Sequence, residues 1–171
     1  GRRDRGWLAK SLLDYVRSDP ATLRCTHAGS YRRSKEILHD IDILVATDKP
    51  AELTEYFSKL PVVNSVIVCG ETKASIRLDD GLQCDLRAVS NKAYPFALQY
   101  FSGSKEHNVE LRKRAKQKGW SLNEYDFQGD DETVILPEVN DEADIYSALG
   151  LDFIPPELRE NRGEIEAAEK G

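Results

Sequence analysis

The fold of this chain is decided by residues 40–46, which read Asp40-Ile41-Asp42-Ile43-Leu44-Val45-Ala46. The run is rich in β-branched residues and therefore predicts a buried strand. Side chains two apart in a strand point to the same face, so Asp40 and Asp42 share one face. In the later run 82–89, Asp85 falls on the row opposite the apolar residues. If these two strands are neighbours, three carboxylates meet at one place.

The segments around this strand predict an α+β fold. Apolar spacing indicates helices over residues 7–16 and 50–60. Strand-like runs cover residues 22–28, 62–69, 74–78 and 82–89, with a turn-prone loop over 31–39. The last two strands are joined by Asp79-Asp80-Gly81, a tight-hairpin signal. We expect a mixed β-sheet with helices on one side.

A second unit is predicted after residue 91. It contains helical patterns over 93–101, 105–118 and 141–149, and short strand-like pieces over 121–127 and 133–136. The predicted boundaries are 1–91 for the first unit and 92–156 for a small α+β second unit. Residues 157–171 are charged and predict a linker toward a further domain. The sequence has no methionine, so we expect it to be a piece of a longer protein.

Composition indicates a soluble protein in a reduced, cytoplasmic setting, with no membrane partner. Of the 171 residues, 40% are hydrophobic and 32% charged, and the three cysteines form no zinc-type cluster. A net charge of −6 argues against a nucleic-acid binder as a whole. Residues 105–118, however, carry six basic residues against two acidic ones, so this helix could contact phosphates locally.

The three carboxylates have two interpretations. An isolated D-x-D pattern is more often a solvated strand end than a metal site. If Asp40, Asp42 and Asp85 converge, their mutual repulsion favours a divalent cation between them, and oxygen ligands favour Mg²⁺ or Mn²⁺ over zinc. Two such ions would support phosphoryl transfer. Just upstream, Gly29-Ser30 and the following basic residues present N–H groups, a hydroxyl and positive charge to an anion.

This pattern, Gly-Ser followed after nine residues by Asp-Ile-Asp and later by a strand aspartate, resembles the nucleotidyltransferase superfamily. The resemblance narrows to the family X DNA polymerases of the bacterial and archaeal type, through residues 29–33, 100–104 and 123–125 together with Asn108 and Arg112. It implies that 1–91 is a palm subdomain and 92–156 a thumb subdomain.

The resemblance also implies a role for individual residues. Asp40 and Asp42 would bind both metal ions, and Asp85 would bind the catalytic one and help to deprotonate the primer hydroxyl. The nucleotide-binding residues would be Gly29, Ser30, Arg33, His39, Tyr100, Phe101, Gly103 and Asn108. The DNA-binding residues would be Lys105, Arg112 and Lys113. His39 departs from the family, which usually has Gly there, and Ser102 replaces the more usual Thr.

Plainer alternatives stay open for the second unit: Tyr100 and Phe101 as packing residues, Asn108 as a helix-surface residue, and Arg112 as part of a solvated basic face. The implied function is two-metal-ion transfer of dNMP from dNTP to a primer 3′-hydroxyl in DNA repair, on template–primer or gapped DNA.

The alternatives are a template-independent or small-molecule nucleotidyltransferase and a binding fragment with little activity. The resemblance implies that an N-terminal DNA-binding region and a C-terminal PHP-type domain accompany this core in the parent chain. We therefore expect feeble polymerisation from these 171 residues alone.

Overall fold

The computed structural model describes residues 5–34, 36 and 40–170. The chain divides into two compact units, Gly1–Asn91 and Lys92–Gly171. Each unit has a hydrophobic core of its own, and the two are described separately below. Among the helices in the described ranges, none is long and apolar enough to cross a membrane.

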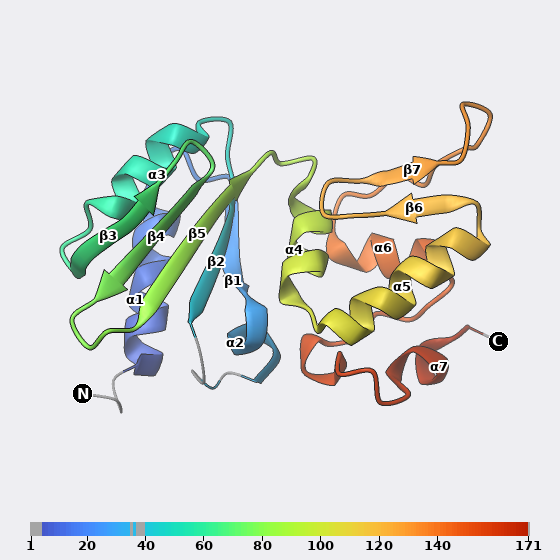
Figure 1. Ribbon diagram of the computed structural model, residues 1–171. Coiled ribbons are helices and arrows are strands. Elements are labelled where there is room, and N and C mark those ends of the chain that lie inside the picture. The colour runs from blue at the N-terminus through green and yellow to red at the C-terminus, as the bar shows by residue number, and fades with distance from the viewer. Residues whose placement is uncertain (1–4, 35, 37–39, 171) are drawn as a thin grey trace. The chain divides into compact units, whose positions relative to one another are not determined.

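The first unit is a five-stranded mixed sheet with the strand order β1-β2-β5-β4-β3 (Figure 1). Its strands are β1 (Arg24–Ala28), β2 (Ile41–Ala46), β3 (Val63–Cys69), β4 (Lys73–Leu78) and β5 (Gln83–Val89). β2 and β5 run parallel, and the other neighbouring pairs run antiparallel. The strand built on residues 40–46 therefore lies inside the sheet, which confirms its prediction as a buried strand.

Two helices cover one face of this sheet, α1 (Arg5–Ser18) and α3 (Pro50–Ser58). The apolar rows of β2, β4 and β5 point to them, because strand side chains alternate between faces. The core consists of Ala9, Leu12, Val16, Leu53 and Phe57 from the helices, and Ile41, Ile43, Val45, Ala74, Ile76, Leu78, Cys84, Leu86 and Ala88 from the strands. The alternate residues of β2 and β5, which include Asp42 and Asp85, lie on the other face.

The β4–β5 connection is the predicted tight hairpin. Gly81 takes a left-handed φ of +86°. The Asp80 carboxylate accepts a hydrogen bond from the Leu82 N–H at 2.9 Å. One element after β1 differs from prediction, because residues 31–34, expected to belong to a loop, lie in the short helix α2 (Gly29–Ser34).

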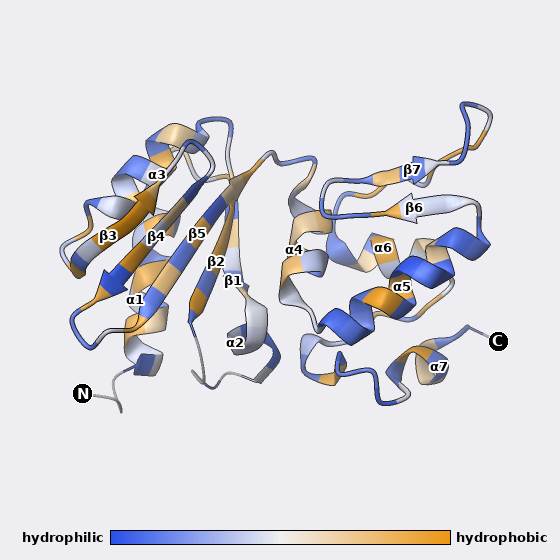
Figure 2. Ribbon diagram, viewed as in Figure 1, coloured by the Kyte–Doolittle hydropathy of each residue, from blue (hydrophilic) through white to orange (hydrophobic). Residues whose placement is uncertain are grey.

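The second unit is built from helices and a small β-hairpin. It contains α4 (Tyr94–Ser102), α5 (Lys105–Gln117), β6 (Trp120–Leu122), β7 (Phe127–Gly129), α6 (Glu142–Ala148) and α7 (Glu164–Ala168), with a short 3₁₀ helix (Pro156–Leu158). Figure 2 shows that α5 is mainly hydrophilic, with a few apolar residues. Two of the apolar residues of α5, Leu111 and Ala115, lie in the core with Phe96, Phe127 and Ile145.

Two predictions for this unit were wrong. Residues 133–136 form no strand; Asp131 instead caps the turn by accepting the Thr133 N–H. Residues 157–171, predicted as a linker, form part of the folded unit through residue 170. Arg159 is wholly buried, and α7 places Ile165 and Ala168 in the core. The charged sequence pattern did not indicate a folded segment, because the partners of its charged residues are distant in sequence or are backbone groups. Arg159 pairs with Glu142, and Glu164 accepts backbone N–H groups.

Candidate active site

The first unit brings two of the predicted acidic residues directly together. Asp42 and Asp85 are register partners across the parallel pair β2 and β5. Both are partly buried, whereas Asp40, one residue before β2, is exposed. The sequence predicted the shared face of Asp40 and Asp42; the adjacency of Asp85 is supplied by the strand order.

The negative charges at this site change the pKa of the Asp42 carboxyl. Its pKa is raised from 3.8 to about 6, first by burial and then by the charges of Asp85 and Asp40. Arg87 and Lys73 lower the pKa, but not enough to cancel the increase. On the neighbouring carboxylate, the Gln83 amide donates a hydrogen bond to Asp85 Oδ1 at 3.0 Å. The site therefore resists holding several negative charges unless a cation neutralises them.

Gly29 lies against the same carboxylate. It begins α2 with a left-handed φ of +63°, and a Cβ at this position would overlap Asp42 Oδ2. Gly29 is one of the predicted nucleotide-binding residues. The structure shows a separate reason for glycine here, because the backbone lies against the Asp42 carboxylate.

The remaining predicted residues near this carboxylate occupy α2 or the segment after it. Ser30 and Arg33 are in α2 and partly buried. Ser34 Oγ donates a hydrogen bond to the Ser30 carbonyl at 3.2 Å, which closes this short helix. The predicted nucleotide ligand His39 lies outside the described residues.

These carboxylates match a divalent metal ion in ligand type, but their described positions do not form a metal-binding arrangement. Carboxylate oxygens are the ligands that Mg²⁺ and Mn²⁺ prefer, and the charged form of Asp42 is destabilised first by burial and then by the two neighbouring acids. However, in the part of the chain that the structure describes, no three His, Cys, Asp or Glu side chains are arranged to hold a metal ion. Asp40, Asp42 and Asp85 therefore form a candidate donor set, not an assembled metal centre.

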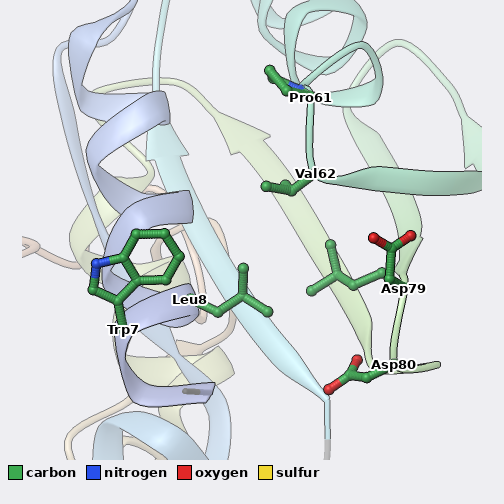
Figure 3. A pocket seen from close by; sticks show the side chains of 7 residues that line it. Trp7, Leu8, Pro61, Val62, Asp79 and Asp80 are labelled. Carbon is green, nitrogen blue, oxygen red and sulfur yellow. The ribbon is translucent and has the colours of Figure 1, made fainter. Parts of the chain in front are cut away.

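A cavity of about 430 Å³ lies elsewhere in this unit and is lined by none of the predicted site residues. Figure 3 shows Trp7 and Leu8 of α1 together with Val62 and the hairpin acids Asp79 and Asp80. Trp7 is 69% exposed at this cavity. This cavity is therefore a feature separate from the carboxylate pair of β2 and β5.

In the second unit, the predicted nucleotide-facing residues gather at the end of α4. The rings of Tyr100 and Phe101 meet edge to face, with centroids 4.9 Å apart. Gly103 caps the helix with a φ of +70°, a conformation that favours glycine. The packing alternative for the two aromatic residues therefore has a structural basis, although both remain partly exposed.

Asn108 is a buried bridge rather than a surface residue. Its amide Nδ2 donates to the Tyr100 carbonyl at 2.8 Å, and its Oδ1 accepts from Gln99 Nε2 at 2.6 Å. These bonds tie the end of α4 to the first turns of α5. Gln99, 2% exposed, was missed by the sequence analysis. Its signal was a single amide in the otherwise apolar run of α4.

The basic helix α5 provides only part of its predicted charge to the surface. Lys105, Arg112 and Lys113 are exposed, as a phosphate-contacting role requires. Arg114 is instead used within the unit, since it donates to the Leu149 carbonyl at 2.6 Å and to Glu169 at 3.0 Å.

The sequence of this chain is similar to those of proteins described as DNA polymerases. Residues 97–160 match the family model described as DNA polymerase beta thumb. The chain is 36% identical over 164 residues to DNA polymerase/3′-5′ exonuclease PolX of Bacillus subtilis (strain 168), which covers 93% of this chain. This chain spans only 28% of that bacterial protein.

A viral relative has a more similar length. The chain is 26% identical over 167 residues to Repair DNA polymerase X of African swine fever virus (isolate Tick/Malawi/Lil 20-1/1983). That match covers 88% of this chain and 95% of the viral protein. The similarity therefore includes both units and extends well beyond the residues of the family model.

Proposed function

Because the chain belongs to the family X DNA polymerases, we propose that it transfers a deoxynucleoside monophosphate from a dNTP to the 3′-hydroxyl of a primer on a template strand. The bond between the α- and β-phosphates breaks in this step, and pyrophosphate leaves. The observation that carries this proposal is the adjacency of Asp42 and Asp85 across β2 and β5, with Asp40 close enough to raise the Asp42 pKa. In this proposal the first unit is the palm and the second the thumb.

The carboxylates have a defined part in the proposed reaction. Asp40, Asp42 and Asp85 would hold two Mg²⁺ or Mn²⁺ ions, which supply charge neutralisation and Lewis acidity when bound. Asp85 accepts the proton of the attacking 3′-hydroxyl, and the Gln83 amide orients its Oδ1. Because residue 29 is glycine, the start of α2 can lie directly against the Asp42 carboxylate. This places the backbone of α2 next to the proposed metal ligands.

The triphosphate and the sugar are assigned to separate groups. The Ser30 hydroxyl and the Arg33 guanidinium, both on α2, hold phosphate oxygens by charge-assisted hydrogen bonds. Tyr100 and Phe101 present partly exposed rings to the nucleotide. Asn108 already uses one donor and its acceptor oxygen within the unit. The groups left for the base are its second N–H and the second lone pair of Oδ1, and Asn108 also places Tyr100.

The DNA contacts are assigned to α5. Lys105, Arg112 and Lys113 are exposed there and neutralise phosphates of the template–primer duplex. The local positive charge of this helix operates within a chain of net charge −6. We therefore expect binding that weakens strongly as salt rises.

The test is extension of a labelled primer with Mg²⁺, Mn²⁺ or EDTA. Asp85→Ala should abolish incorporation, because loss of a metal-binding carboxylate removes several kcal/mol of transition-state stabilisation. Asp48→Ala, at an exposed carboxylate after β2, is the matched control and should retain activity. Undiminished incorporation by Asp85→Ala would refute the proposal.

Template choice separates polymerase from other nucleotidyltransferases. Changing the templating base should change which dNTP is incorporated; indifference to the template would favour the template-independent alternative. We expect extension by the 171 residues to be weak, because binding energy contributes to positioning of the reacting atoms. Measurable activity is favoured by one observation: the match covers 95% of the viral protein, whose name is Repair DNA polymerase X.

A further inference from the structure

A buried ion pair lies beside the turn that joins α4 and α5. The Arg159 guanidinium, wholly buried, donates to both oxygens of Glu142 at 2.7 and 3.0 Å. Its Nε donates to the Ile154 carbonyl at 2.9 Å. The guanidinium also lies over the rings of Tyr146 and Phe153, at 5.0 and 5.4 Å from their centroids. The planar fork of Arg159 is thus fixed in position and orientation.

The backbone of the same residue holds the α4–α5 turn. The Arg159 carbonyl accepts a hydrogen bond from the Ser104 N–H at 3.1 Å. Ser104 in turn caps α5, because its Oγ accepts the His107 N–H at 3.2 Å and its carbonyl accepts the Asn108 N–H at 3.0 Å. A displacement of Arg159 would therefore be passed to Ser104 and then to the first turn of α5.

A second buried contact reinforces this attachment. His107 is wholly buried and bonds to Glu164 through Nδ1 at 2.6 Å and to the Tyr146 hydroxyl through Nε2 at 2.9 Å. The Glu164 carboxylate also accepts the backbone N–H groups of Asn161 and Arg162 at 2.9 and 2.7 Å. The segment 159–164 is consequently attached to the start of α5 at two points.

We propose that Arg159 and Glu142 are positioning residues that fix the α4–α5 turn, and through it Tyr100 and Phe101, for nucleotide binding. The inference deepens the proposed function and rests on it for the identity of the nucleotide. A buried ion pair is a poor source of stability, because desolvation of the two charges offsets much of their attraction. Its directional bonds do restrict geometry, and here the restricted backbone group is the one that holds Ser104.

The variants separate geometry from stability. Arg159→Lys keeps the charge but loses the planar fork, and Glu142→Gln keeps the shape but loses the charge. The double variant Arg159→Met/Glu142→Leu replaces both partners by apolar groups, so it remains foldable where a single change leaves a buried charge unpaired. Glu169→Gln is the matched control, since it breaks the Arg114–Glu169 pair between α5 and the C-terminal segment.

Three measurements are made on each variant of the 171-residue chain: hydrogen exchange of the Ser104 amide, thermal unfolding, and the KM and kcat for dNTP in primer extension. In the double variant we expect the Ser104 amide to exchange about tenfold faster or more, with thermal stability near that of the wild type. The KM for dNTP should rise about tenfold with a smaller change in kcat, as expected for a misplaced binding segment. Glu169→Gln should leave exchange and KM unchanged.

The inference is overturned if the double variant keeps wild-type Ser104 exchange and KM, because the ion pair would then not fix the α4–α5 turn. It is also overturned if Glu169→Gln produces the same changes. The proposed function fails separately: a wild-type chain without template-directed incorporation would refute polymerase activity, while accelerated Ser104 exchange in the double variant would still support the placement of the turn by Arg159.

Discussion

Replacing Asp85 by asparagine should make the metal-free chain more stable while it abolishes nucleotide transfer. Asn is nearly isosteric with Asp, and its side-chain oxygen can still accept the Gln83 amide that now bonds to Asp85. The substitution therefore removes one negative charge beside Asp42 with little change in packing. A gain in stability together with a loss of activity would indicate that the repulsion between these acids is normally relieved by a bound cation.

The magnitude follows from the Asp42 pKa, which rises from 3.8 to about 6 in the folded chain. A raised pKa in the folded state means that this group stabilises the fold below pH 3.8 and that the contribution is lost as pH rises through about 6. A shift of this size corresponds to at most about 3 kcal/mol, reduced by solvent screening of a partly exposed group. Asp85 is the second cause of the shift after burial, so its removal should return about 1 kcal/mol at pH 8.

The assay is urea unfolding in EDTA at pH 4 and pH 8. Asp85→Asn should raise the unfolding free energy at pH 8 and have little effect at pH 4, where Asp42 is protonated in the folded state. Mg²⁺ at pH 8 should then stabilise the wild type more than the variant, since a ligand that binds only the folded state adds to its stability. A destabilised variant at pH 8, or an equal gain at both pH values, would refute the reasoning.

Three further perturbations test other parts of the molecule. Gly29→Ala should lower the free energy of unfolding in urea by about 1–3 kcal/mol, because residue 29 has a left-handed backbone conformation and the new Cβ would overlap the Asp42 carboxylate. Gly81→Ala is the control: its backbone is also left-handed but its Cβ would meet no neighbouring atom, so it should lower this free energy less. Asn108→Leu leaves the buried Gln99 amide without its partner and removes one hydrogen bond from the Tyr100 carbonyl, which keeps the Gly103 N–H at 3.3 Å. It should cost about 1–3 kcal/mol, so a neutral effect in thermal or urea unfolding would contradict the bridging role. The pair Arg112→Ala/Lys113→Ala should reduce the slope of log affinity for duplex DNA against log salt by about 1–2, as measured by fluorescence anisotropy; an unchanged slope would exclude both from phosphate contact.

Much of the first unit was predictable because its signals are local. The alternation in residues 40–46 and 82–89 marked two strands and the face of each acid, and Gly81 marked the hairpin between β4 and β5. The adjacency of Asp42 and Asp85 was conditional, since alternation sets the face of a residue but not which strands pair. The strand predicted over residues 133–136 of the other unit was wrong, because a β-branched, apolar run of only four residues does not outweigh the turn that Asp131 caps.

The sequence by itself determined which chemical groups this protein carries and on which elements: two acids two residues apart on a strand, a Gly-Ser pair upstream, and a basic helix in a second unit. These follow from residue type and spacing, which local backbone geometry converts directly into faces and termini. The tertiary structure alone decided which groups touch. It set Gly29 against Asp42, turned Asn108 inward to bridge two helices, and buried Arg159 in a segment predicted to be a linker. A charged residue has no intrinsic reason to be buried, and only a distant partner such as Glu142 makes its burial favourable.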